Sequence, residues 1–266
     1  MYIDDVRFPN SKGLSLAGRL YVPSARNPPV AILAHCFKGD KSCIPLYPYC
    51  AGVLQKKGYA VFLYDSAGFG ESGGRSEEST PASQISDLES AIGFVRDCKD
   101  PVLDSNRIGL IGHSLGATAV LGNAYQQGVN ALILLAASFN GPFLSNRYKD
   151  LITAAKNNGK SYIESPYART GRVYKIGLDL LDRLKDFDYT SILSALEIPV
   201  CVISAGNDSI VNQSGVQEHF ALIPHADKEL VVIDKANHDF DGEEIADEVA
   251  EKIQSWFGRL LFPGVS

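Results

Sequence analysis

Short apolar runs alternate with longer mixed segments along most of the chain. The runs are rich in β-branched residues, and they span residues 30–35, 59–65, 107–111, 131–137, 199–204 and 229–234. Because each run is almost continuously apolar and is bounded by Gly, Pro or polar residues, it predicts a strand that is buried on both faces. The segments between the runs suit helices, so the pattern predicts an α/β fold whose mostly parallel sheet carries helices on both faces.

The first 23 residues follow a different pattern. The segments YIDDVRFP and LSLAGRLYV flank the turn-forming sequence NSKG, which predicts an antiparallel hairpin at one edge of the sheet. The sheet should therefore contain about eight strands. Two helix starts are also predicted: Thr80 is expected as the N-cap before Pro81, and Asp241 as the cap of the last helix with Glu244 in its first turn.

One long stretch interrupts this alternation. Residues 140–190 carry five of the twelve Tyr and nine basic against six acidic residues, a net charge of +3. The gap between the flanking strands is about sixty residues, too long for an ordinary connection. We therefore expect one α/β core formed by residues 1–139 and 191–266, with residues 140–190 inserted as a small cap, here called the cap segment. A plain helical excursion with solvated charges is the alternative.

Composition excludes several classes of protein. The 266 residues are 45% hydrophobic and 21% charged, which argues against disordered, collagen-like and coiled-coil chains. The net charge of −6 argues against nucleic-acid binding, and the apolar runs are too short to span a membrane. The acidic start MYIDDVRFPN is unlike a signal peptide, so we expect a cytoplasmic protein. The five Cys lack zinc-like spacing, so we expect reduced thiols and no metal.

The strongest motif is Gly112-His113-Ser114-Leu115-Gly116, which follows a predicted strand and precedes a predicted helix. G-x-S-x-G in this setting is typical of a nucleophile elbow, a tight turn that exposes a strained serine. Gly112 and Gly116 supply the small residues that such a turn requires. The backbone N–H of Leu115 would face the oxyanion formed when Ser114 attacks a carbonyl. A helix entry that uses Ser114 only as a cap is the alternative.

A serine nucleophile needs a base and an acid that orients it. Of the five His, only His238 follows the last predicted strand, at the sheet edge where active sites of open α/β sheets assemble. Asp208 is the first carboxylate after the strand at 199–204, and the segment after 131–137 offers no acid. These residues predict a triad of Ser114, His238 and Asp208, with a turn-forming role as the alternative for Asp208.

The motifs together resemble the α/β-hydrolase serine esterases, and within that superfamily the cinnamoyl and feruloyl esterase-like carboxylesterases. The order Ser114, Asp208, His238 matches that scaffold. Residues 65–72, DSAGFGES, match the D-x-x-G-x-G-x-S motif of the family, and the resemblance covers nearly the whole chain. It implies a small cap and assigns the second oxyanion N–H to Phe37. Cys36 departs from the family, which has Gly there, so the geometry of this loop is left open.

Substrate contacts are the least determined part of the site. We expect contacts from His35 and His113 beside the catalytic loops and from Tyr148 and Tyr174 of the cap segment. Packing is the alternative for His113. The tyrosines at 148, 162, 167, 174 and 189 suit either an aromatic acyl pocket or the core of the cap itself.

These inferences lead to one expected function. The chain should be a serine carboxylesterase that hydrolyses short-chain or hydroxycinnamoyl-type esters of small molecules without a cofactor. A thioesterase, a monoacylglycerol lipase-like enzyme or a peptidase could use the same triad. A cofactor-free haloperoxidase and a non-catalytic binding protein are weaker alternatives. The oligomeric state is left open, a homodimer included.

Overall fold

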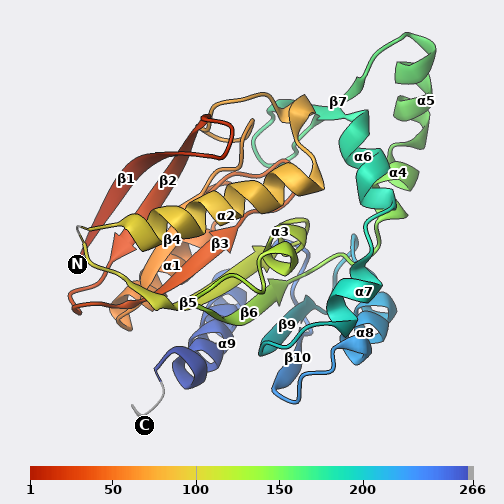
Figure 1. Cartoon of the computed structure of the whole chain (residues 1–266). Coiled ribbons are helices and arrows are strands. Elements are labelled where there is room, and N and C mark those ends of the chain that lie inside the picture. The colour runs from red at the N-terminus through yellow and green to blue at the C-terminus, as the bar shows by residue number, and fades with distance from the viewer. Residues whose placement is uncertain (100, 263–266) are drawn as a thin grey trace.

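The computed structural model of the chain describes residues 1–99 and 101–262, and its largest feature is an eight-stranded sheet (Figure 1). The order across the sheet is β1-β2-β4-β3-β5-β6-β9-β10. The strands are β1 (Tyr2–Pro9), β2 (Ser15–Val22), β3 (Pro29–Ala34), β4 (Ala60–Tyr64), β5 (Asp104–His113), β6 (Val129–Leu135), β9 (Val200–Ala205) and β10 (Lys228–Ile233).

The pairing of the strands confirms the predicted topology. β1 and β2 form an antiparallel hairpin at one edge, and β2 pairs antiparallel with β4. All other neighbours in the sheet are parallel. The carboxyl ends of β3, β5, β9 and β10 therefore meet at one edge, and the loops that leave these strands carry the candidate active-site residues.

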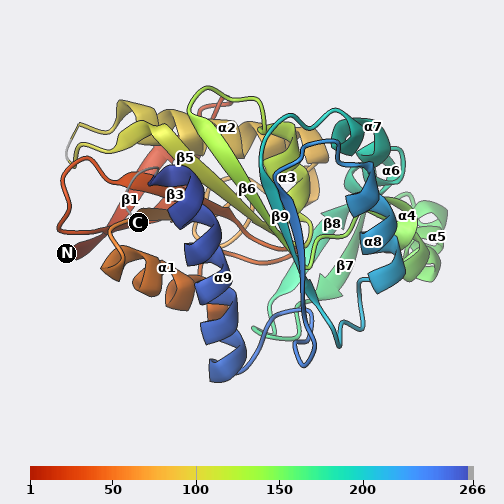
Figure 2. The same ribbon diagram turned by 90° about the horizontal axis from the view of Figure 1, so that it is seen from below.

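Helices cover both faces of the sheet, as Figure 2 shows from below. One apolar cluster joins one face to residues of four helices, which are α2 (Pro81–Asp97), α3 (Gly116–Gly122), α7 (Tyr189–Ser194) and α8 (Gln213–Leu222). A second cluster joins the opposite face to α1 (Leu46–Lys56) and α9 (Glu243–Leu261). None of the helices in residues 1–99 and 101–262 is long and apolar enough to cross a bilayer.

The cap segment forms a separate group of elements beside the sheet, at the right of Figure 1. It contains α4 (Pro142–Arg147), α5 (Lys149–Asn157), β7 (Tyr162–Pro166), β8 (Val173–Gly177) and α6 (Leu178–Lys185). β7 and β8 pair antiparallel in a small sheet of their own. A third apolar cluster gathers Ile163, Ile176 and the leucines of α6 around Leu115, so the cap segment packs directly over the nucleophile loop. Tyr189, near the end of the cap segment, belongs to α7 and packs in the apolar cluster of the main sheet.

The two predicted helix starts differ in outcome. Thr80 caps α2 as predicted, and its hydroxyl accepts a hydrogen bond from the Ser83 backbone N–H. The prediction for Asp241 is wrong, because α9 begins at Glu243 after Gly242, and no side chain caps it. The Asp241 carboxylate instead accepts hydrogen bonds from Arg169 of the cap segment. A sequence pattern cannot anticipate such a distant partner.

Candidate active site

The turn at the end of β5 holds Ser114 in a strained conformation. Its φ is +53°, in the left-handed region that non-glycine residues seldom adopt. A Cβ on Gly112 would lie 2.7 Å from the Ala117 Cα, and one on Gly116 would lie 2.3 Å from the Ala34 carbonyl oxygen. Both contacts are too short for a side chain, so the turn can form only with glycine at these positions. This geometry is that of a nucleophile elbow.

Ser114, His238 and Asp208 lie in one hydrogen-bonded line. The Nε2 of His238 is 3.0 Å from the Ser114 Oγ, and its Nδ1 is 2.8 Å from the Asp208 Oδ2. The Asp208 side chain is 1% exposed and that of His238 11% exposed. The structure therefore brings together three residues that lie far apart in the sequence, on loops after β5, β9 and β10.

Asp208 is held as a carboxylate by its surroundings. Its Oδ1 accepts hydrogen bonds from the backbone N–H groups of Ile210 at 2.7 Å and Val211 at 2.9 Å. Burial raises the pKa of Asp208, but its bonds to His238 and to these amides outweigh burial and lower the pKa below the ordinary value. The acid is thus ionised at neutral pH, and it fixes the His238 ring with Nε2 directed to Ser114.

Two backbone amides border the cavity next to Ser114, those of Phe37 and Leu115. Within the described part of the chain, neither N–H donates to another group, so both are available to an oxyanion. Cys36 does not disturb this loop, because the residue with positive φ is Lys38, at +60°, and not Cys36. The Cys36 side chain is buried, and its Sγ lies 3.7 Å from the Tyr167 hydroxyl.

A buried chain of hydrogen bonds connects this loop to the His238 loop. The backbone N–H of Cys36 donates to the Tyr47 hydroxyl at 3.1 Å, and that hydroxyl lies 2.7 Å from the His113 Nδ1. The His113 Nε2 is 2.9 Å from the His238 carbonyl oxygen. Burial, and then the nearby His238, lower the pKa of His113 to about 4, so its ring is neutral and can accept at one nitrogen and donate at the other.

His113 therefore does not contact the cavity, contrary to our expectation for it. It is fully buried behind Ser114 and His238, where it sets the distance between two loops. Tyr47 was not identified from the sequence, because it lies on α1 and reaches the site only through tertiary packing. One signal in the sequence could have identified it: the Tyr47 side chain carries a polar hydroxyl, yet it lies on the buried face of α1.

His35 is also placed away from the cavity, which corrects its expected role in substrate binding. Its Nε2 accepts from the Ser66 backbone N–H at 3.1 Å, and its Nδ1 is 2.8 Å from the Cys36 carbonyl oxygen. Its ring lies edge-on to Phe69. His35 thus fastens the oxyanion loop to the loop after β4.

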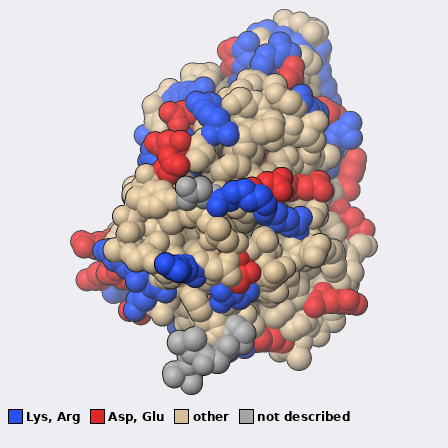
Figure 3. All heavy atoms as spheres, turned by 60° about the vertical axis from the view of Figure 1, so that its left-hand side comes forward, with Lys and Arg blue, Asp and Glu red and all other residues tan. Residues whose placement is uncertain are grey.

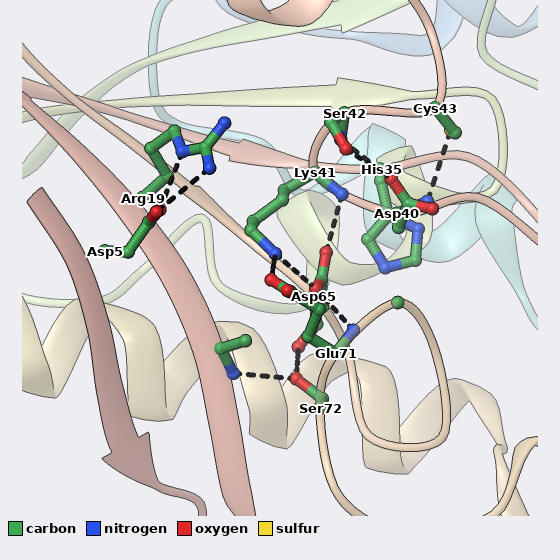
Figure 4. A network of polar contacts seen from close by, with 12 residues as sticks. Asp5, Arg19, His35, Asp40, Lys41, Ser42, Cys43, Asp65, Glu71 and Ser72 are labelled. Atoms are coloured by element: carbon green, nitrogen blue, oxygen red, sulfur yellow. Dashed lines mark hydrogen bonds and ion pairs between the residues drawn. The ribbon is translucent and has the colours of Figure 1, made fainter. Parts of the chain in front are cut away.

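The DSAGFGES motif acts through Asp65, whose side chain is fully buried. Figure 4 shows its contacts with Lys41 and Glu71. Asp65 accepts from the Lys41 backbone N–H at 2.6 Å, from the Lys41 ammonium at 2.8 Å and from the Glu71 backbone N–H at 2.9 Å. A Cβ on Gly70 would lie 2.3 Å from the Asp65 Oδ2, which explains the glycine. The motif is therefore a buried scaffold for the loops around the site.

A cavity of about 290 Å³ opens from Ser114 and His238 between the core and the cap segment. Its apolar lining comes from both parts: Phe37, Leu115, Phe143, Leu144, Leu184 and Ile210. Tyr148, Tyr167 and Tyr189 line it as well. Tyr174 does not, which corrects that expectation, because it is buried against Phe69 with ring centroids 5.5 Å apart. Tyr162 also lies outside the lining.

The described residues contain one set of side chains that could approach a metal ion, made of His113, His238 and Asp239. All four ring nitrogens of the two histidines are engaged in the hydrogen bonds given above. Asp239 forms an ion pair with Arg169 at 2.6 Å. Binding a metal there would require breaking these hydrogen bonds, including those of His238 to Ser114 and Asp208.

Several known proteins are similar to this chain in sequence or in fold. Residues 35–155 match a family described as serine aminopeptidase, S33. A relative named thiohydrolase aneE, from Aspergillus aculeatus, is 34% identical over 168 residues, which are 59% of this chain and 51% of the relative. The aligned part thus spans about half of that relative.

Two solved structures share the fold over nearly the whole chain. The alpha/beta hydrolase GrgF from Penicillium sp. sh18 has a TM-score of 0.81 at 19% identity and covers 98% of this chain and 100% of its own. Est1E from Butyrivibrio proteoclasticus, solved with ferulic acid bound, has a TM-score of 0.77 at 18% identity and covers 95% and 99%. With the sheet order and the elbow turn described above, these matches show that the chain has the α/β-hydrolase fold.

Proposed function

We propose that the protein is a serine hydrolase that cleaves carboxylic esters of small molecules through an acyl-enzyme on Ser114. The observation that carries this proposal is the continuous line from Ser114 through His238 to Asp208 beside an apolar cavity. Phe37 and Leu115 line the same cavity, and within the described residues their backbone N–H groups donate to no other group. A nucleophile, a base, an orienting acid and an oxyanion site are the full set that acyl transfer requires.

Each residue has a role in the proposed reaction. His238 takes the Ser114 proton as the Oγ attacks the ester carbonyl, and Asp208 stabilises the imidazolium that forms. The amides of Phe37 and Leu115 bind the oxyanion, each lowering the barrier by about 3 kcal/mol. His238 then gives the proton to the leaving alcohol. Water attacks the acyl-enzyme by the same route and releases the acid.

The lining that the cap segment gives the cavity favours substrates with a small acyl group, of the short-chain or hydroxycinnamoyl type. It closes the cavity opposite Ser114 with Tyr148 and Tyr167, whose rings combine an apolar body with a polar hydroxyl. Est1E, one of the structural neighbours, binds ferulic acid, which is a molecule of this type. We propose that residues 140–190 act as the lid of the substrate site.

The proposal is tested with p-nitrophenyl acetate and a fluorophosphonate probe. The Ser114→Ala variant should lose at least about ten-thousandfold in kcat/KM and all covalent labelling, because no other group replaces the nucleophile. Ser161→Ala removes an exposed serine of the cap segment and serves as the matched control, with wild-type rate and labelling. Full turnover by Ser114→Ala would show that the mechanism is wrong.

Thioester hydrolysis is the second candidate, favoured by the similarity to a protein named a thiohydrolase. The same residues would act, with a thiol in place of the leaving alcohol. Octanoyl esters and thioesters with the same leaving-group skeleton separate the two functions. A kcat/KM at least about tenfold higher for the ester supports the esterase, and the reverse ratio supports the thioesterase.

A further inference from the structure

The cavity wall carries an excess of positive charge. Three cations line it, Lys38, Arg147 and Arg169, together with one acid, Asp239. Arg169 is neutralised, because it pairs with Asp239 at 2.6 Å and with Asp241 at 2.5 Å. Lys38 and Arg147 have no carboxylate partner within the described residues. Two positive charges thus face the substrate space uncompensated.

Lys38 is held in place by neutral groups alone. Its Nζ donates to the Tyr148 hydroxyl at 3.3 Å, the Ser165 Oγ at 3.0 Å and the Pro166 carbonyl at 2.9 Å. The ring centroids of Phe37, Tyr148 and Tyr167 lie within 6.0 Å of it. These contacts hold the ammonium group in position, yet they leave its charge available to an anion.

Arg147 lies at the end of α4 and is exposed. Within residues 1–99 and 101–262 no group accepts a hydrogen bond from its guanidinium, which leaves its fork of N–H donors free. Its positive charge acts on the Tyr148 hydroxyl, as the charge of Lys38 does. Burial raises the pKa of Tyr148, but the Ser165 hydrogen bond and the charges of Lys38 and Arg147 lower it overall. In Figure 3, blue side chains gather at the top of the view, at the height of α5 in Figure 1.

We propose that the ester cleaved here carries an anionic group, a carboxylate or a phosphate, which binds between Lys38 and Arg147. This inference rests on the proposed function and narrows its substrate class. The apolar wall of Phe143, Leu144 and Leu184 would contact the hydrocarbon part of the substrate. A fixed ammonium and a free guanidinium on one wall would orient the anionic end and keep the carbonyl at Ser114.

Two matched pairs of esters test the proposal and locate the anion. The acyl-side pair is p-nitrophenyl hydrogen suberate and its methyl ester. The alcohol-side pair is the octanoate of p-hydroxybenzoic acid and of its methyl ester. We expect the wild-type kcat/KM to favour the anionic member of at least one pair about fivefold or more. This preference should shrink as salt rises from about 0.05 to about 0.5 M.

Variants separate the anion site from intrinsic differences between the esters. Arg147→Gln should lower the anionic-to-neutral ratio at least about fivefold, and Lys38→Gln should lower it further. Lys149→Gln, two residues away and outside the cavity lining, should keep the wild-type ratio. A ratio that is the same in wild type and Arg147→Gln for both pairs, or a preference for the neutral esters, overturns the proposal while leaving the esterase function intact.

A binding measurement decides the question if neither pair is hydrolysed. Calorimetry with the Ser114→Ala variant compares monomethyl suberate with dimethyl suberate and needs no turnover. Tighter binding of the monoanion, lost when Arg147→Gln is added, supports the anion site. Equal binding of the two esters contradicts it. Lack of turnover together with lack of Ser114 labelling would instead count against the proposed function.

Discussion

The loops at the carboxyl edge of the sheet and the cap segment fix their side chains by different means. At this edge, His113 at the end of β5 and Asp65 in the loop after β4 are fully buried, and their polar atoms are paired with neighbouring backbone and side-chain groups. The cap segment is attached to the core by the partly exposed ion pairs of Arg169 and by the hydrogen bonds that Lys38 donates to it. Buried bonds are costly to break, whereas exposed ion pairs contribute little.

This difference separates two tasks. The loops set the positions of the atoms that react, so changes there should reduce both the rate and the free energy of unfolding. The cap segment closes the substrate space, so changes there should act mainly on KM. The following substitutions test that division, from the largest expected effect to the smallest.

The largest effect is expected from His238→Ala in the loop after β10. Without the base, kcat/KM for p-nitrophenyl acetate should fall on the order of ten-thousandfold, and the free energy of unfolding should fall as well, because the buried Asp208 carboxylate loses its side-chain partner. His225→Ala, in the loop after α8, is the matched control and should keep the wild-type rate. A fall of less than about tenfold for His238→Ala would mean that another group acts as the base.

Gly116→Ala should affect both stability and activity. The new Cβ would lie 2.3 Å from the Ala34 carbonyl oxygen, so the elbow must shift, at a cost of about 3 kcal/mol in the free energy of unfolding. The measurements are urea unfolding and esterase rate. Gly93→Ala is the control, because a Cβ at Gly93 of α2 meets nothing within 4 Å and alanine favours helices. Equal stability of the two variants would contradict the tight elbow.

The stability of the protein should depend on His113 in mildly acidic solution. Its pKa is about 4 in the folded chain and about 6.5 when unfolded. The unfolded chain therefore binds more protons between these values, so the free energy of unfolding falls as the pH drops from about 6.5 to about 4, by about 2–3 kcal/mol from this residue.

Urea unfolding at pH values near these two limits measures the effect of His113. His113→Gln should remove most of this fall, although it lowers stability at neutral pH by breaking the bonds to Tyr47 and the His238 carbonyl. His225→Gln should keep the wild-type pH dependence. If His113→Gln and the wild type lose the same stability on acidification, the buried imidazole is not the cause.

Arg169→Gln should have the smallest effect. It breaks the ion pairs to Asp239 and Asp241 that fasten the cap segment to the His238 loop. We expect KM to rise a few-fold at nearly constant kcat, and the free energy of unfolding to change by less than about 1 kcal/mol. Arg183→Gln breaks an exposed pair within α6 and controls for the loss of one cation. If Arg169→Gln lowers kcat by a larger factor than it raises KM, the cap segment also helps to position the reacting groups.

The fold followed from the sequence because it depends on periodicity, which is local. All six apolar runs and the hairpin lie in strands of the main sheet, and Thr80 caps α2. Ser114, Asp208 and His238 were found by their places after strands, and they lie within hydrogen-bond distance of one another, although their catalytic role remains a prediction.

The remaining expectations failed where the direction of a side chain mattered. His35 and His113 end or follow strands, and a sequence does not tell whether such a side chain faces the cavity or the interior. Tyr174 alternates with exposed neighbours on β8, which places it inward, against Phe69 rather than substrate. Lys38 was passed over as a loop residue, because its three partners are brought to it by the fold of the cap segment.

The bond between Cys36 and Tyr47 has a consequence for the motions of the site. The Cys36 amide belongs to a loop that borders the cavity, and loop amides usually exchange their hydrogen with water quickly. Here the hydrogen is held by the buried Tyr47 hydroxyl of α1, which is itself bonded to His113 at the end of β5. Exchange therefore requires α1 to separate from the end of β5, and not only an opening of the loop. The Cys36 amide should thus exchange its hydrogen much more slowly than the Phe37 amide next to it, which has no partner within the described residues.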